Sequence, residues 1–131
     1  MITIKGKQFS YDENDVINFS EGLIGLPEMR RAVLIAMVDY EPFCWLASVE
    51  SEKTRFIVVD PYEFFSSYKP FSPAEDDKKL QTLAIVNVSS EWEKTTVNLR
   101  APLVINKETH SGAQRILSDT SYQFAESLIQ K

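Results

Sequence analysis

Short, β-rich apolar runs separated by turn residues make up most of the chain. Runs 57–59 and 83–86 are continuously apolar, which is typical of strands buried on both faces, whereas 2–5 and 16–19 alternate apolar and polar positions. The other predicted strands cover residues 32–38, 43–49, 55–60, 81–88, 95–99, 103–105 and 114–117. This pattern predicts an all-β fold, a small closed or partly open β-barrel formed by residues 1–131 as a single domain.

Helix signals are few. Asp60 followed by Pro61 supplies an N-cap and a proline at the first helical position, which predicts a short helix through residues 62–65. Ser72 and Glu75 have the spacing of a capping box and predict a second short helix. Residues 121–129 place apolar side chains at helical spacing, which favours an amphipathic helix there. We therefore expect one or two short helices beside the strands.

The charge and the cysteine content indicate a compartment and a class of partner. The formal net charge is −5, so the chain repels phosphate backbones, and we expect no direct nucleic-acid binding. An acidic surface suits a basic protein partner instead. A single cysteine, Cys44, cannot form an internal disulfide, and no apolar run is long enough for a signal peptide or a membrane span. We expect a cytoplasmic protein without membrane contact.

Residues suited to catalysis or metal binding are scarce. His110 is the only histidine and lies in a polar stretch, and Cys44 lies in an apolar run typical of a small core residue. A metal site needs three or four ligands, which one histidine and one cysteine do not supply. We expect no catalytic site, no metal and no cofactor. A Cys44–His110 pair, or an enzyme using Cys44 or Asp60, stays open as the weaker alternative.

Two segments combine turn and apolar residues unusually. Residues 19–27 place apolar side chains between Gly22 and Gly25, which predicts a tight connection in which the glycines adopt positive φ. Residues 60–71 hold five aromatic residues in twelve positions. Some of these rings are expected to plug one end of the barrel, and others to form a surface for a partner. The sequence leaves these two roles open.

A third segment, 97–106, is a strand interrupted by a proline. Pro102 cannot donate to a ladder, so the strand must break, bulge or lie at an edge there. Asn98 and Asn106 flank the interruption, and their side chains are suited to satisfying its free backbone groups. An interrupted edge strand can also accept a strand from a partner, although a purely structural role is favoured.

In this order, these segments resemble the FliW family of flagellar assembly factors. The resemblance covers residues 2–122 and rests on five elements in register: Ile-Asn-Phe-Ser-Glu-Gly-Leu-Ile-Gly at 17–25, Trp-Leu-Ala-Ser at 45–48, Asp-Pro-Tyr-Glu-Phe-Phe-Ser-Ser-Tyr at 60–68, Asn-Leu-Arg-Ala-Pro-Leu-Val-Ile-Asn at 98–106, and Gly112 with Gln114, Ile116, Leu117 and Tyr122. One residue and the C-terminal segment depart from the family pattern. Leu26 replaces an aromatic residue, and residues 123–131 lack the usual basic, proline-containing tail.

The resemblance implies a non-enzymatic partner switch that controls flagellin translation. Family members bind the carbon storage regulator CsrA, an RNA-binding repressor, and relieve its repression of flagellin synthesis; they are sequestered by the C-terminal region of flagellin. The partner-binding residues expected here are Asp60, Pro61, Phe64, Phe65, Tyr68, Asn98, Pro102 and Asn106. An OB-like barrel that binds single-stranded RNA through stacked aromatic residues is the alternative, although the acidic charge disfavours it.

Overall fold

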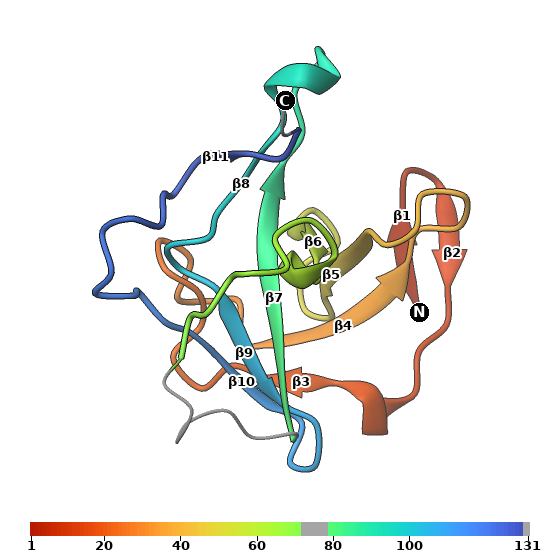
Figure 1. Ribbon diagram of the computed structural model, residues 1–131. Helices are drawn as coiled ribbons and strands as arrows, with labels where there is room; N and C mark the ends of the chain where they lie inside the picture. The colour runs from red at the N-terminus through yellow and green to blue at the C-terminus, as the bar shows by residue number, and fades with distance from the viewer. Residues whose placement is uncertain (72–78, 130–131) are drawn as a thin grey trace.

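The computed structural model describes residues 1–71 and 79–129, which form strands and 3₁₀ turns (Figure 1). The strands are β1 (Ile2–Ile4), β2 (Lys7–Phe9), β3 (Ile17–Asn18), β4 (Arg31–Ala36), β5 (Cys44–Ser48), β6 (Arg55–Val59), β7 (Leu80–Asn87), β8 (Thr96–Val97), β9 (Leu103–Asn106), β10 (Ser111–Gln114) and β11 (Glu126–Ser127). The turns are η1 (Glu13–Asp15), η2 (Pro61–Glu63) and η3 (Trp92–Lys94). The helix predicted at Ser72–Glu75 lies outside the described residues.

Seven strands close into a hydrogen-bonded ring in the order β3-β4-β5-β6-β7-β9-β10. The long strand β7 closes it, because residues 84–86 pair with β6 and residues 80–83 pair with β9. All pairings are antiparallel except that of β10 with β3. The all-β class, with helical structure limited to short turns, is confirmed. Closure leaves the strands of the ring without a free edge, which removes the usual route to edge-to-edge association.

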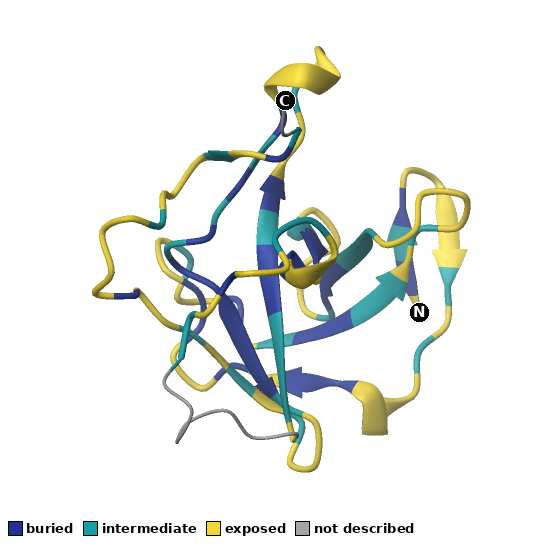
Figure 2. Ribbon diagram, viewed as in Figure 1, coloured by how far each residue is buried: buried dark blue, intermediate teal, exposed yellow. Residues whose placement is uncertain are grey.

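The apolar runs of the sequence fill the inside of this ring (Figure 2). Phe19, Leu46, Val58 and Leu103 are all fully buried in its main cluster. A second cluster lies around β7, β8 and the segment after η2, and a third lies beneath the β1–β2 hairpin, where Ile2 and Ile4 are buried. The continuous apolar runs of β6 and β7 thus face two clusters at once.

The segment after η3 forms a bulged strand along one edge of β7. Val97 pairs with Val86, and Leu103 pairs with Leu83. The chain therefore advances six residues from Val97 to Leu103 while β7 spans three from Leu83 to Val86, a surplus of 6 − 3 = 3 residues. The surplus falls on residues 98–102, which separate β8 from β9. The interruption predicted at Pro102 is therefore a bulge, not a chain end or a free edge.

The glycines of the 19–27 connection adopt the predicted positive φ, +69° at Gly22 and +78° at Gly25. In the same connection, Leu23 and Leu26 form an isolated bridge across Ile24 and Gly25. A Cβ at Gly22 would lie 2.3 Å from the carbonyl oxygen of Pro27, so both φ and space require glycine there.

Two predicted elements are wrong. Residues 121–129 form no helix, because their backbone bonds to other segments: the N–H groups of Leu99 and Arg100 donate to the Gln123 carbonyl, and β11 pairs with β8. The strand predicted at 114–117 lies at 111–114 instead, where it pairs with β9. No pattern in the sequence predicts β2, η1 and η3, which carry mostly polar residues.

Candidate partner-binding surface

The turn η2 begins as its sequence predicts. The Asp60 carboxylate accepts a hydrogen bond from the Tyr62 N–H at 2.9 Å, and Pro61 occupies the first helical position and is buried. This cap fixes the turn at the end of β6. The residues of the turn and those after it therefore face partly toward solvent and partly toward the apolar core. Tyr62 is 43% exposed, while Phe64 and Phe65 are half-buried against the second apolar cluster.

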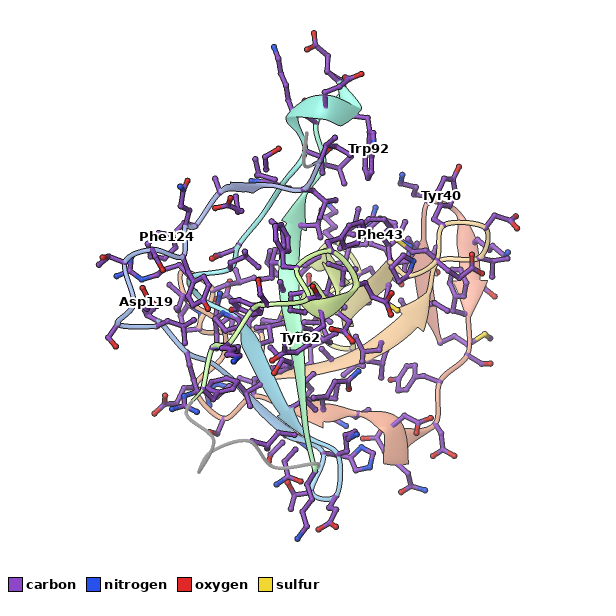
Figure 3. The ribbon with its side chains drawn as sticks, in the orientation of Figure 1. Tyr40, Phe43, Tyr62, Trp92, Asp119 and Phe124 are labelled. Atoms are coloured by element: carbon purple, nitrogen blue, oxygen red, sulfur yellow. The ribbon has the colours of Figure 1, made fainter. Side chains whose placement is uncertain are left out.

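The rings of Phe43, Phe64 and Trp92 come from three separate segments and meet beside η2. We refer to these three residues, together with the exposed Tyr62 of η2, whose ring lies 5.9 Å from that of Tyr68, as the aromatic surface (Figure 3). The Phe43 ring lies 5.8 Å from that of Phe64 and 6.1 Å from that of Trp92, the second pair meeting edge to face. Trp92 is 44% exposed. Phe43 and Trp92 were not among the predicted site residues, although the sequence Glu-Trp-Glu at 91–93 is a signal for an exposed tryptophan.

The loops that carry the aromatic surface also carry carboxylates. The exposed acids are Asp39 and Glu41 before Phe43, Glu63 in η2, and Glu91 and Glu93 beside Trp92. Lys94 offsets one of them through an ion pair of 3.0 Å with Glu91. Apolar rings within an excess of negative charge suit a partner that is both apolar and basic.

Tyr68 has an internal role. Its side chain is only 3% exposed, and its hydroxyl donates to the Leu99 carbonyl oxygen at 2.5 Å. The Tyr122 ring lies edge to face at 4.8 Å, and its hydroxyl accepts from the Lys69 N–H. Burial, and to a lesser degree the neighbouring phenols of Tyr122 and Tyr62, raise the pKa of Tyr68. Tyr68 therefore connects residues 60–71 to the bulge at 98–102 and is buried from solvent.

Within the 98–102 bulge, the Asn98 side chain accepts from two backbone donors, while the N–H groups of Leu99 and Arg100 also donate to the Gln123 carbonyl. The Asn98 Oδ1 accepts from the N–H groups of Arg100 at 3.2 Å and Ala101 at 2.9 Å, which confirms the predicted role of Asn98. Pro102 is buried and has no N–H to satisfy. Asn106 does not serve the bulge: its Oδ1 accepts from the N–H groups of Glu108 and Thr109 and caps the turn between β9 and β10.

The carbonyl groups of the bulge are satisfied from outside it. Four consecutive carbonyl oxygens, at Leu99, Arg100, Ala101 and Pro102, accept in turn from the Tyr68 hydroxyl, the Leu117 N–H, the Gln114 side-chain amide and the Arg115 N–H. The donors to these carbonyl groups come from Tyr68 and from residues 114–117. The sequence elements at 60–68, 98–106 and 112–122 therefore meet at the bulge. Asn98 and Pro102 thus shape the fold next to the aromatic segment.

The first sequence element joins the same network. The Gln114 Oε1 accepts from the Ile24 N–H at 2.8 Å, while its amide nitrogen donates to the Ala101 carbonyl at 3.1 Å. Nearby, a Cβ at Gly112 would lie 2.6 Å from the Phe19 ring, which explains the glycine of the fifth element. The bridging role of Gln114 has no signal in the sequence, because nothing in a sequence shows which backbone groups a bulge leaves free.

Cys44 and His110 lie on separate parts of the ring. Cys44 begins β5, whereas His110 lies in the turn after β9, and β3 and β4 separate β5 from β10. Burial raises the pKa of the Cys44 thiol, which is the opposite of nucleophile activation. The described residues contain no group of three or more acids, histidines or cysteines able to hold a metal ion. No helix in residues 1–71 and 79–129 is long and apolar enough to cross a membrane.

Comparisons with known proteins agree with this arrangement. The sequence model of one family, described as FliW protein, matches residues 2–128. The flagellar assembly factor FliW of Clostridium beijerinckii is 34% identical over 93% of this chain and 92% of its own length. The proteins of the same name from Caldanaerobacter subterraneus and Bacillus subtilis are 36% and 32% identical, over 86% and 88% of this chain and 81% and 86% of their own lengths.

A solved structure extends the likeness to the fold. The crystal structure of a flagellar assembly factor FliW covers 100% of this chain and 97% of its own, with a TM-score of 0.88 and 26% sequence identity. The five sequence elements are thus found in a chain whose fold matches that of a solved flagellar assembly factor FliW. With the family match spanning residues 2–128, the chain belongs to the FliW family.

Proposed function

We propose that this protein is a non-enzymatic, cytoplasmic partner switch that controls flagellin translation. In this proposal it binds the translational regulator CsrA and relieves the repression of flagellin synthesis, and it is sequestered when flagellin binds it through the flagellin C-terminal region. Its relatives are named flagellar assembly factors, which supports a role among flagellar proteins. The protein acts on CsrA and not on the RNA, in keeping with its net charge of −5.

The observation that carries the proposal is the aromatic surface with its five nearby carboxylates. Exposed rings such as Tyr62 and Trp92 supply the large contact area that protein interfaces use, and exposed acids speed the approach of a basic RNA-binding protein. Phe64 and Phe65 act as half-buried anchors, and Asp60 and Pro61 fix the turn that presents them. Tyr68, Asn98 and Pro102 support the surface from inside, and Asn106 shapes the adjacent β9–β10 turn.

Titration calorimetry with CsrA and flagellin from the same organism tests the switch. Each partner is titrated singly, and flagellin is then titrated into the preformed complex with CsrA. We expect binding to both and displacement of CsrA by flagellin. Binding to neither partner by a folded sample would overturn the proposal, and a stable ternary complex would overturn its competitive step.

Substitutions test the aromatic anchors. Phe65→Ala and Trp92→Ala should weaken binding to at least one partner by about tenfold or more, because buried aromatic anchors dominate interface energies. Trp92 is well exposed, so its variant should keep the fold even if Phe65→Ala is destabilised. Ile116→Ala, which changes an exposed apolar residue that is not part of the aromatic surface, is the matched control. Folded variants that bind both partners with wild-type strength would refute the assignment.

A further inference from the structure

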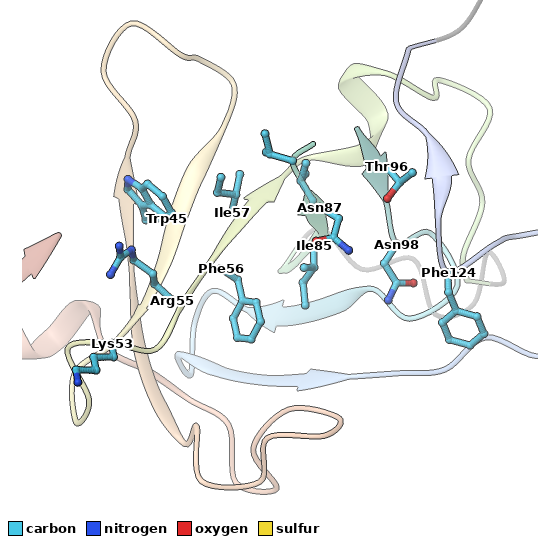
Figure 4. A pocket seen from close by; sticks show the side chains of 12 residues that line it. Trp45, Lys53, Arg55, Phe56, Ile57, Ile85, Asn87, Thr96, Asn98 and Phe124 are labelled. Carbon is cyan, nitrogen blue, oxygen red and sulfur yellow. The ribbon is translucent and has the colours of Figure 1, made fainter. Parts of the chain in front are cut away.

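Two short strands, β8 and β11, lie outside the closed ring of seven strands. One side of β8 pairs with the end of β7, and in residues 1–71 and 79–129 the other side is covered by β11 alone. The two pairs that cover it are Val97 with Glu126 and Thr96 with Ser127. Thr96 on β8 and Phe124, just before β11, lie on these neighbouring segments in Figure 4. The outer edge of β8 is therefore a strand edge that only two paired residues protect.

One large side chain holds β11 against this edge. Leu128, directly after β11, is only 2% exposed and packs in the second apolar cluster with Val97 and Leu99. Its N–H donates to the carbonyl oxygen of Thr95 at 3.1 Å. Leu128 is the most buried residue of the segment 124–129, whose residues 124, 125 and 127 are exposed. The edge of β8 thus combines backbone hydrogen-bonding groups with a pocket for one aliphatic side chain, the two parts of a strand-binding site.

The segment that covers β8 has few other attachments. The Gln123 carbonyl oxygen accepts from the N–H groups of Leu99 at 3.0 Å and Arg100 at 3.1 Å. Between this attachment and β11, Phe124 and Ala125 are exposed. Segments with few buried contacts open at a lower free energy than the core does. Residues 123–128 can therefore leave β8 without opening the ring, because no pairing of the ring includes them.

The residues that now cover β8 show what its edge accepts. They are extended, with Ser127 exposed and Leu128 buried, which is the alternation of a strand with one face on an apolar core. A helix does not fit this edge, because its N–H and C=O groups already bond within the helix. A strand added outside β11 would leave the pocket filled by Leu128 and would contact exposed side chains only. Replacement of β11 is therefore favoured over addition to it.

We propose that the outer edge of β8 is a strand-acceptor site, at which an extended segment of a partner protein replaces residues 126–128. The partner segment carries one large aliphatic side chain next to polar residues, as this chain's own segment does. The site adjoins the aromatic surface: Phe64 packs against the same cluster as Leu128, and the Thr95 N–H donates to the Trp92 carbonyl. The proposal stands on β8 and β11 alone and does not require the CsrA switch.

A peptide copy of the covering segment tests the site. The probe is a fluorescein-labelled peptide with the sequence of residues 122–129, Tyr-Gln-Phe-Ala-Glu-Ser-Leu-Ile, and its control carries Asp in place of the Leu. Binding to the full chain is followed by fluorescence anisotropy. We expect the Leu128→Asp protein to bind the probe at least about tenfold more tightly than wild type, because the wild-type segment competes for the same edge. The control peptide should bind at least about tenfold more weakly than the probe.

Further variants and hydrogen exchange locate the binding. Leu128→Ala, a milder change, should give an affinity between those of wild type and Leu128→Asp, and it keeps the test valid if the Asp variant does not fold. Ile116→Ala, which truncates an exposed aliphatic residue, is the matched control and should bind as wild type does. The Leu99 N–H, which donates to Gln123, should exchange at least about tenfold faster in Leu128→Asp and slow again with the probe bound. Exchange at Leu46, inside the ring, should be unchanged.

Three results would overturn the proposal. The first is equal affinity of the probe for wild type and both Leu128 variants, which would mean that β11 is not replaced. The second is no binding of the probe to folded Leu128→Ala protein. The third is a wild-type dimer in sedimentation velocity that Leu128→Asp abolishes, which would assign the edge to a second copy of this chain. None of these results depends on CsrA, so failure of the switch and failure of the strand-acceptor site are distinguishable.

Discussion

Gly112 lacks a side chain because the Phe19 ring occupies the space where a Cβ would lie, at 2.6 Å. Phe19 is fully buried at the centre of the ring and cannot move away without disturbing the core. We therefore expect Gly112→Ala to lower the free energy of unfolding by about 1–3 kcal/mol, as overpacking does. Urea denaturation followed by circular dichroism measures the change. Ala113→Ser, at the exposed neighbouring position, should be nearly neutral, and equal stability of Gly112→Ala and wild type would contradict the steric argument.

The second residue-scale prediction concerns Cys44. Burial raises the pKa of its thiol, and the ordinary value for a cysteine is about 8.5. At pH 8 a smaller fraction of Cys44 than of free cysteine is therefore thiolate, which is the reactive form. Alkylation by iodoacetamide should be slower than that of free cysteine at pH 8 and should still be accelerating above pH 9. Fast alkylation of the folded protein at pH 7 would contradict this expectation and revive a nucleophilic role.

At the scale of the elements, the hydrogen bonds of the 98–102 bulge predict how much substitutions there change the free energy of unfolding. Asn98→Ala removes the acceptor of the Ala101 N–H and one of the two acceptors of the Arg100 N–H inside a half-buried segment, so the free energy of unfolding should fall by about 1–3 kcal/mol. Asn106→Ala removes a similar pair of hydrogen bonds in an exposed turn, where water replaces them, and should cost less. Thermal denaturation of both variants compares the two sites. A larger loss at Asn106 than at Asn98 would refute this account of the bulge.

The elements also show what could be predicted from the sequence. Strands with apolar runs, the Asp60 cap and the interruption at Pro102 follow from local chemistry, and all three are present. Residues 121–129 are the counter-example, since their helical spacing is genuine but only nine residues long. Such a segment is a marginal helix on its own, and bonds to the bulge and to β8 determine its backbone instead.

The candidate site could be predicted only in part, because some of its residues have a local sequence signal and others come together only through long-range contacts. The rings at η2 lie in one short sequence segment, so their concentration is visible in the sequence. Phe43 and Trp92 reach the aromatic surface only because β5 and the turn after β7 fold against η2, a long-range contact without a local signal.

At the scale of the whole molecule, the net charge conceals two surfaces of opposite character. The loops of the aromatic surface carry Asp39, Glu41 and three other exposed acids. Around Trp45, by contrast, Lys5 and Arg55 lie over the ring, and Lys53 lies in the loop before β6. Long-range steering therefore differs for partners of opposite charge, and each is attracted to a different region.

This separation yields a prediction on association rates. The rate constant for association with CsrA should fall as salt rises, and Glu91→Gln with Glu93→Gln should lower it about threefold to tenfold at low salt. Both side chains are exposed and the Glu91–Lys94 pair contributes little stability, so the fold should be unaffected. Lys5→Glu with Lys53→Glu places negative charge on the other surface and should not slow CsrA. Stopped-flow measurements across a salt series give the association rate constants. A rate constant that does not change with salt, or that both double variants lower equally, would mean that the acids of the aromatic surface do not guide the repressor.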